Sequence, residues 1–324
     1  MKGLLRRLSG GKNPKLLYYA EEYGRRLMPR FVCLWRRKRM LRSLERRTDY
    51  PLLKKRLDYY CGIADTATFP KISLPLGRYP RHNCFKVYRL DSGDVLRYFP
   101  QRLRWRIEGG DNVSVFPIPT VVKSRPLCPG NRNDVLLKLN RVRHYIFVDD
   151  RLRWEDKKDL AVFRGKCSGK PLRIRFLNRF AGSELVDAGC NDCPEGVPER
   201  CFVKKMSLYE QLSYKFVVCL EGNDVASNLK WVMGSNSLAV MPHPRFETWF
   251  MEGLLEPGVH YVEVHDDFSD LEDKLRYYIA HPEEAERIVR AANAWTEQFR
   301  DERTERRLQI AVMQRYFERT GQLP

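Results

Sequence analysis

The sequence contains no uninterrupted apolar run of the length that crosses a bilayer, which is about 18 residues or more. Its first residues, MKGLLRRLSGGK, lack the apolar core of a secretory signal peptide. Neither a G-x-x-x-x-G-K-S/T loop nor a G-x-G-x-x-G fingerprint is present, which argues against an ordinary ATPase or nicotinamide dehydrogenase. The missing apolar run and the missing signal-peptide core predict a cytoplasmic protein without a transmembrane helix.

Acidic residues are scarce at the N-terminal end. The formal net charge is +18. Residues 1–57 hold 18 Lys and Arg but only four Asp and Glu, a surplus of 14 that leaves 4 for the rest of the chain. A basic segment of this kind predicts an acidic partner: nucleic acid, anionic lipid or a phosphorylated substrate.

The sequence contains nine cysteines, an odd number. We expect no metal site and no cofactor. Four lie in apolar runs, as expected of reduced thiols: Cys33, Cys61, Cys84 and Cys219. A cluster with one C-x-x-C pair and no nearby His consists of Cys190, Cys193 and Cys201. Zinc there would need a fourth ligand, for which Cys167 is the candidate. Thiols in an irregular loop are the alternative.

Residues 1–60 have a helical, amphipathic pattern. The stretch PRFVCLWRRKRMLRSLERR places Phe31, Leu34, Trp35 and Leu41 among many arginines. A helix lying in the plane of a membrane surface has this composition. So does a helix that packs on the protein with its charged face in water, and both interpretations stay open.

Strands and helices alternate in the second half of the chain, which predicts a parallel sheet with right-handed crossovers and an α/β fold. Strands are expected at 144–150, 160–165, 216–220, 238–241 and 259–264. Capping boxes predict helix starts at Ser207 with Glu210 and at Ser269 with Glu272. Pro282 is expected in the first turn of another helix. The Pro-rich FPIPTVVKSRP is expected to be extended.

A polar turn, Glu221-Gly222-Asn223-Asp224, separates a core strand from a helix expected to start near Val225–Ser227. Ligands bind at the carboxyl ends of parallel strands, and the first N–H groups of a helix lack internal partners. The turn is therefore a candidate anion site, with Lys230 one turn further on to balance a diphosphate. An ordinary connection with a solvated Lys is the alternative.

Three other positions are candidates for chemistry. Arg164 and Gly165 end a strand as FRG, where a guanidinium can fork onto phosphate oxygens or simply lie at the surface. Glu247, among aromatics in RFETWF, can accept hydrogen bonds from sugar hydroxyls or form a salt bridge with Arg245 or a similar residue. Asp111, in the Gly-flanked loop EGGDNVSVFPIP, can act as a general base or as a turn former.

Together, FRGKCSGKPLRIRF, YKFVVCLEGNDVASNLKW, SNSLAVMP, ETWFMEGLLEPGVHYVEVHDDFSDLEDKL and EEAERIVRAANAW resemble glycosyltransferase family 90, the capsule-associated-protein-like family. RLDYYCG, GGDNVSVFPIPTVVKSRP and NRVRHYIFVDD are similar to its bacterial lipopolysaccharide core branch, which is related to Rumi-type protein O-glucosyltransferases. The resemblance covers roughly residues 56–300.

This resemblance implies a GT-B fold, with two Rossmann-like domains facing across a cleft, and an inverting, metal-independent transfer from a UDP-sugar. The implied parts are a basic N-terminal segment (1–57), an acceptor-side domain (58–158), a nucleotide-sugar-binding domain (159–305) and a C-terminal helix that packs back on the N-terminal domain (306–324).

By the same resemblance, the catalytic base falls on Asp111, with Asp149 or Asp150 as alternatives. The donor-binding residues implied are Arg164, Gly165, Gly222, Asn223, Ser227, Asn228, Lys230 and Glu247. On the acceptor side are Lys123, Arg125 and Asp149. Two departures from the family pattern are the Asn at position 228, where many members have Arg, and EPGVHY in place of KPWVHY.

The predicted function is transfer of a hexose to a hydroxyl of a lipopolysaccharide core or related surface glycan, on the inner face of the plasma membrane. The predicted partners are the UDP-sugar, a phosphorylated glycolipid acceptor and an anionic membrane surface bound through the basic N-terminus. A nucleic-acid-binding protein is the first rival, although no RNP, zinc-finger or basic-zipper pattern is present. A non-catalytic glycan-binding member of the family is the second.

Overall fold

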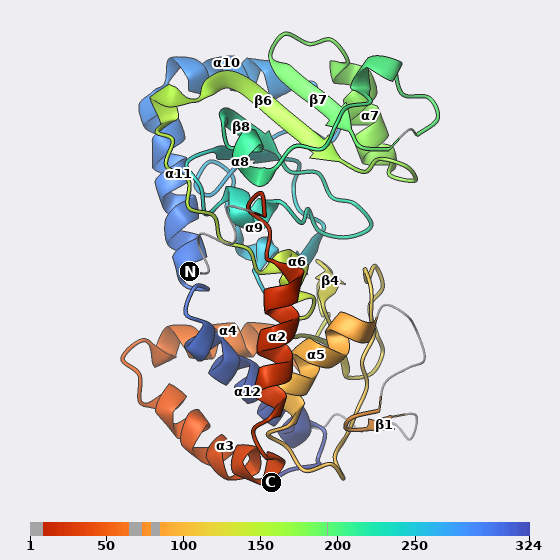
Figure 1. The fold of residues 1–324 in the computed structure, drawn as a ribbon, viewed down its shortest axis with the longest axis vertical. Coiled ribbons are helices and arrows are strands. Elements are labelled where there is room, and N and C mark those ends of the chain that lie inside the picture. The colour runs from red at the N-terminus through yellow and green to blue at the C-terminus, as the bar shows by residue number, and fades with distance from the viewer. Residues whose placement is uncertain (1–8, 65–72, 79–84, 193) are drawn as a thin grey trace. The chain divides into compact units, whose positions relative to one another are not determined.

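The computed structural model describes residues 9–64, 73–78, 85–192 and 194–324, and the chain divides into two compact units (Figure 1). Unit 1 consists of Met1–Pro14, Arg143–Arg245 and Glu252–Gln298. Unit 2 consists of Lys15–Val142, Phe246–Met251 and Phe299–Pro324. Each unit is therefore assembled from segments that are separated in the sequence.

Unit 1 contains the predicted parallel sheet, so the α/β class is confirmed. Its five strands are β6 (Lys158–Gly165), β7 (Val186–Cys190), β8 (Tyr214–Val218), β9 (Leu238–Met241) and β11 (Val262–Glu263). All neighbours are parallel, and the order across the sheet is β11-β9-β8-β6-β7. Numbered along the chain within this sheet, the order is 2-1-3-4-5, a doubly wound arrangement whose direction reverses between β6 and β8.

Apolar side chains hold helices against this sheet. The helices of unit 1 are α7 (Pro171–Phe180), α8 (Leu208–Gln211), α9 (Leu229–Val232), α10 (Leu271–Ala280) and α11 (Pro282–Glu297), with 3₁₀ turns at Trp154–Asp156, Glu199–Cys201 and Glu252–Leu254. The Phe176 ring of α7 lies 5.3 Å from that of Phe163 and 5.1 Å from that of Phe268, between centroids. Every residue of β8 and β9 is buried, as expected of central strands in a sheet covered on both faces.

Several local predictions can be compared with the structure. The Ser207–Glu210 capping box is present in full, and Pro282 occupies the first turn of α11. The second capping box is wrong: α10 begins at Leu271 with Asp270 as its N-cap, without a capping hydrogen bond from a side chain. The strand expected at 144–150 is also wrong, because α6 (Arg141–His144) is followed by irregular backbone.

Unit 2 is mainly helical. Its helices are α2 (Lys15–Arg26), α3 (Arg30–Glu45), α4 (Tyr50–Tyr60), α5 (Phe85–Leu96) and α12 (Glu302–Arg319). Its strands are β1 (Leu74–Pro75), β2 (Arg104–Trp105), β3 (Thr120–Val122), β4 (Ser124–Pro126), β5 (Asp134–Leu136) and β10 (Phe246–Thr248). α12 packs against α3, α4 and α5, and α2 packs against α5.

Within the described residues, the strands of unit 2 pair only two by two: β1 with β2, β3 with β5 and β4 with β10. The Rossmann-like sheet implied for residues 58–158 is not formed there, because these strands are two or three residues long and Pro interrupts them. The compact units also run differently from the implied ranges: residues 143–158 lie in unit 1, and the stretch Phe246–Met251 lies in unit 2.

Among the described residues, no helix is both long and apolar enough to cross a membrane.

Candidate functional site

The first candidate site lies at the carboxyl edge of the parallel sheet of unit 1. Between β6 and β8 the chain order reverses, and the loops that follow these strands leave the sheet in different directions. Such a switch point leaves an opening beyond the strand ends, where doubly wound proteins bind their ligands. Here it is flanked by residues 166–170 after β6 and 219–228 after β8.

Arg173 joins the two loops at this switch point. The guanidinium donates from Nη1 to the carbonyl of Lys166 at 2.8 Å, from Nη2 to that of Leu220 at 2.8 Å and from Nε to that of Glu221 at 3.1 Å. Burial lowers the pKa of Arg173, but an arginine remains protonated at any physiological pH. One fixed cation therefore sets the positions of both loops.

Two glycines make room for this guanidinium. A Cβ atom added to Gly222 would lie 3.1 Å from Nη2 of Arg173, and one added to Gly165 would lie 3.3 Å from its Nη1. Such distances are tighter than ordinary carbon contacts. Both glycines were predicted to contact donor phosphates, and the structure gives them a packing role beside Arg173.

Further charged groups lie along the same edge. Lys170 Nζ donates a hydrogen bond to the side-chain oxygen of Asn223. Asn223, which was expected to bind the nucleotide sugar, lies in the loop after β8. Glu221 accepts from both the backbone N–H (2.8 Å) and Nε (2.9 Å) of Arg245. Lys166 is exposed. The edge thus carries the ammonium and guanidinium groups that a diphosphate requires.

The turn after β8 differs from its prediction. The helix starts at Leu229 rather than near Val225–Ser227, and α9 is a single turn with Asn228 as its N-cap. The Gly222 N–H donates to the carbonyl of Asp224 at 3.0 Å, and Nδ2 of Asn228 donates to that of Val218 at 3.1 Å. The helix start expected near Val225–Ser227 is therefore wrong, and the Gly222 N–H and the Asn228 amide make their hydrogen bonds within the loop. Ser227 is half-buried in that loop.

Lys230 is buried, with 1% of its surface exposed, and its Nζ lies 2.6 Å from Glu252 Oε1. Sequence reasoning expected it near a diphosphate. The apolar neighbours of Lys230 in α9, Leu229 and Trp231, are buried as well. The lysine is thus paired inside unit 1.

Arg164 also has an internal partner. Its Nη2 lies 2.6 Å from Asp187 Oδ1, and its Nη1 donates to the Asp187 carbonyl at 2.7 Å. The Tyr214 hydroxyl donates to the other oxygen of Asp187, and burial together with this carboxylate raises the pKa of Tyr214 to about 12. This group ties β6 to β7 and β8.

Glu247 lies in unit 2, on β10, outside the unit that contains the parallel sheet. It is buried and forms an ion pair of 2.7 Å with Nε of Arg125, and the Tyr59 hydroxyl also donates to it. Arg125 further donates to the Asp134 carbonyl at 2.9 Å. The salt bridge weighed for Glu247 is present, but its partner is Arg125, whereas Arg245 pairs with Glu221.

Asp111 forms the second candidate site, in unit 2. Its carboxylate lies 2.5 Å from Nζ of Lys123, whose side chain is 1% exposed, whereas the side chain of Asp111 is 29% exposed. Gly110 has a φ of 95°, a conformation that favours glycine, and its N–H donates to the Tyr88 hydroxyl at 3.2 Å. The carboxylate of Asp111 is therefore partly exposed to solvent and is held in position by the buried ammonium of Lys123.

The alternative bases have different surroundings, and both lie in unit 1. Asp149 is 62% exposed and pairs with Arg151 at 3.2 Å. Asp150 is buried, lies 2.8 Å from Nζ of Lys157 and accepts from the backbone of Asn236 at 2.9 Å. Burial lowers the pKa of Lys157. Asp150 therefore has a structural pairing, whereas Asp149 in unit 1 and Asp111 in unit 2 are both exposed to solvent in part.

Sequence reasoning missed Arg173 and the pairing of Lys123 with Asp111. Arg173 stands within the quoted motif FRGKCSGKPLRIRF, eight residues beyond Gly165. Its position on the first turn of the helix that follows β6 is the signal that would have pointed to it. Nothing in the sequence indicates that Lys123 is buried.

The cysteine cluster has no metal-site geometry in the described part of the chain. No group of three or more His, Cys, Asp or Glu side chains is arranged to bind a metal there. Cys193 lies outside the described residues. Cys167, Cys190 and Cys201 are buried and reduced, and burial raises the pKa of the Cys167 thiol to about 12. A thiol with such a pKa is unreactive at neutral pH.

Comparison with known proteins gives one consistent family. The profile of Glycosyl transferase family 90 matches residues 137–316. O-glucosyltransferase LpsA of Dichelobacter nodosus is 38% identical over 308 residues, covering 94% of this chain and 95% of that protein. Protein O-glucosyltransferase 3 of Homo sapiens is 29% identical over 179 residues, covering 53% of this chain and 34% of that protein. A family profile over more than half of the chain and a relative matched at nearly full length lead to one conclusion: the chain belongs to glycosyltransferase family 90.

Proposed function

We propose that this protein is an inverting glycosyltransferase that moves glucose from UDP-glucose to a hydroxyl of a lipopolysaccharide core or related surface glycan. The observation that carries the proposal is the near full-length match to a bacterial O-glucosyltransferase. The name of that relative specifies glucose and an oxygen acceptor, and the motifs similar to the bacterial branch favour a surface glycan.

The two units have separate roles in the proposed reaction, as in a GT-B enzyme. Unit 1 binds the donor at the switch point of its parallel sheet. Lys166, Lys170 and Arg245 supply positive charge for the diphosphate. Arg173 holds the loop that carries Lys166 and the carbonyl of Glu221, the residue with which Arg245 pairs. These cations take the place of a metal ion in stabilising the leaving group. Unit 2 supplies the base.

The reaction needs one proton acceptor and one leaving group. Asp111 accepts the proton of the acceptor hydroxyl, and the oxygen attacks the anomeric carbon from the face opposite the diphosphate. The new carbon–oxygen bond forms as the bond to the β-phosphate breaks, and UDP leaves with the electron pair. Lys123 holds the carboxylate of Asp111 in position before the attack.

The proposed acceptor is a phosphorylated glycolipid at the inner face of the plasma membrane. The support is the positive charge of residues 1–57, which matches both the phosphates of such an acceptor and the anionic leaflet in which it lies.

The first experiment is a calorimetric titration with UDP, GDP, CMP and ATP in the presence of EDTA. Selective binding of UDP supports the donor class, and UDP-glucose hydrolysis or transfer that Asp111→Asn abolishes supports the mechanism. No response to any of the four nucleotides would contradict the proposal and favour a glycan-binding protein without catalytic activity.

A further inference from the structure

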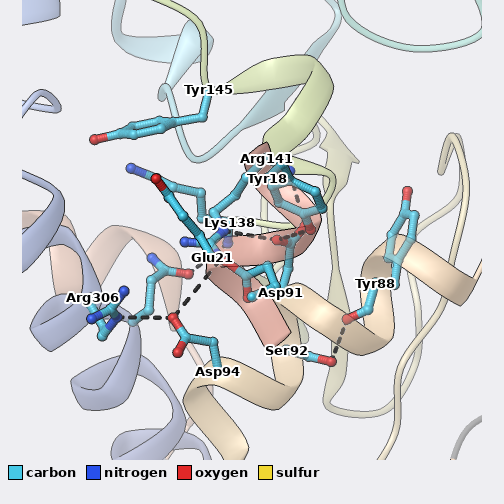
Figure 2. Close-up of polar contacts among 12 residues, drawn as sticks. Tyr18, Glu21, Tyr88, Asp91, Ser92, Asp94, Lys138, Arg141, Tyr145 and Arg306 are labelled. Carbon is cyan, nitrogen blue, oxygen red and sulfur yellow. Dashed lines mark hydrogen bonds and ion pairs between the residues drawn. The ribbon is translucent and has the colours of Figure 1, made fainter. Parts of the chain in front are cut away.

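Helix α2 directs polar side chains toward its neighbours, and one of them, Glu22, is buried. The Tyr18 hydroxyl donates to Asp91 of α5 at 2.7 Å (Figure 2). One turn later, Glu22 is 2% exposed and forms ion pairs with Arg25 (2.6 Å) and with Arg141. Arg141 also lies 2.8 Å from Asp91, so the contacts form one network. This network fixes which side of α2 faces the rest of unit 2.

The opposite side of α2 is apolar and exposed. Leu16 is 84% exposed, Tyr23 is 54% and Leu27, just beyond the helix, is 84%. At 3.6 residues per turn, Leu16 and Tyr23 lie about 100–160° around the helix from Tyr18 and Glu22. A helix of a water-soluble surface has the reverse arrangement, with its apolar stripe facing the core.

Helix α3 extends this pattern. Cys33 and Leu44 are buried, on the side where α3 packs against α12. Phe31 is 72% exposed and Trp35 is 73% exposed, one turn apart on the other side. We define the α2–α3 apolar stripe by its exposed members: Leu16, Tyr23, Leu27, Phe31, Leu34 and Trp35. One side of α3 therefore packs on the protein while Phe31 and Trp35 stay exposed on the other, so the structure combines features of the two interpretations left open by the sequence.

From Tyr23 onward, cations accompany the stripe without any acidic side chain. Residues 23–44 contain eight Lys and Arg and no Asp or Glu. The exposed ones on α3 are Arg36, Lys38, Arg39 and Arg42. In a helix, positions 31, 35, 38 and 42 share one side, so the aromatic half is continued directly by a cationic half. Aromatic and aliphatic side chains next to Lys and Arg are the composition of a helix that lies in a membrane interface.

We propose that the α2–α3 apolar stripe inserts into the head-group boundary of an anionic bilayer, with Phe31 and Trp35 as anchors. This extends the membrane part of the proposed function from attraction by charge to insertion. A single-stranded nucleic acid would use the aromatic rings and the cations but would leave Leu16 and Leu27 in water. A second copy of the chain would bring the two sets of cations together, which is unfavourable.

The test is flotation of the full chain with vesicles of phosphatidylglycerol and phosphatidylcholine, and with vesicles of phosphatidylcholine alone. We expect binding to the anionic vesicles. The double variant F31S/W35S should bind at least about tenfold more weakly, because binding follows the apolar area buried. The triple variant K38A/R39A/R42A should also lose more than about tenfold at low salt, since each cation near an anionic surface contributes to binding.

A matched control changes two exposed apolar residues of unit 1, as L254S/V259S, and should float like the wild type. Wild-type flotation by F31S/W35S would overturn the proposal. So would a wild-type dimer that F31S/W35S dissociates in the absence of vesicles, or a single-stranded oligonucleotide whose binding the same variant abolishes. The vesicles contain neither donor nor acceptor sugar, and D111N should float normally, so a failure of this proposal is distinct from a failure of the transferase proposal.

Discussion

Nζ of Lys123 lies 2.5 Å from the carboxylate of Asp111 and is itself almost completely buried. A lysine so placed cannot reach solvent, so its charge acts on the groups that it contacts, and Asp111 is one of them. The pair gives a loop carboxylate a fixed orientation, which a general base needs if it is to meet its substrate hydroxyl reproducibly.

Replacing Asp111 with Asn should lower kcat by about 10²- to 10⁴-fold, the range typical of a lost general base. The amide oxygen can still accept from Lys123, so the fold should be kept. The measurement is the rate of glucosyl transfer with saturating UDP-glucose, together with a thermal melt. Activity close to that of the wild type would show that the base lies elsewhere.

Lys123→Met should reduce kcat by about tenfold or more while the KM for the donor stays unchanged, because this lysine orients the base. Lys123→Arg, which retains the charge, should recover part of the loss. An equal loss with Arg, accompanied by a lower melting temperature for both variants, would indicate a structural role alone.

Arg173→Lys should weaken donor binding and lower the free energy of unfolding by about 1–3 kcal/mol. A lysine cannot reach the carbonyls of Lys166, Leu220 and Glu221 at the same time, so buried acceptors lose their donors. Calorimetry with UDP and denaturant unfolding measure the two effects. Arg175→Lys, two residues along the same helix and exposed, is the matched control, and identical behaviour of the two variants would argue against the bridge.

Glu247→Gln should destabilise the protein by about 3–5 kcal/mol, the usual cost of removing one member of a buried ion pair. Arg125 would then lack its carboxylate. UDP binding by the folded fraction should be unchanged, because the residue lies in unit 2. A specific loss of UDP affinity without a loss of stability would instead support the donor-binding role of Glu247 implied by the family resemblance.

The lowered pKa of Lys138 should make the free energy of unfolding depend on pH. Burial and the nearby Arg56, which shares the carboxylate of Glu305, lower its pKa to about 7. Between this value and the ordinary lysine pKa, the unfolded chain binds a proton that the folded protein does not. Stability should therefore rise with pH in this window, and fall as pH drops toward 7, by up to about 1.4 kcal/mol per pH unit.

The comparison is with Lys138→Met, in which this contribution is absent and all other titrating groups are kept. Urea unfolding of both proteins at several pH values between 7 and 10 gives the difference. Parallel curves would show that Lys138 remains charged throughout.

Much of unit 1 was predictable from the sequence, because each strand has a local signal. The apolar run at Leu238–Met241 became β9 with the same bounds, and Ser207 with Glu210 formed its capping box. Such signals depend on neighbours in the chain. The stretch 144–150 has the same apolar character, yet it forms no strand, because pairing partners are set by tertiary structure.

The site was less predictable because it depends on long-range partners. Lys230 and Arg164 stand where a phosphate-binding residue would stand in the sequence, but Glu252 and Asp187 lie against them in the fold. The approach of Arg125 to Glu247 joins residues 122 positions apart. No periodicity or spacing encodes such pairs, and a surface lysine and a buried one look alike in a sequence.

The interleaving of the two units has a consequence for biosynthesis. Unit 1 is complete once residue 298 has left the ribosome, whereas unit 2 still lacks α12 at that moment. Helices α3, α4 and α5, which α12 contacts, are made early and wait for it through most of translation. A nascent chain therefore carries its basic N-terminal helices without their packing partner, and chaperones or a nearby membrane would meet them first.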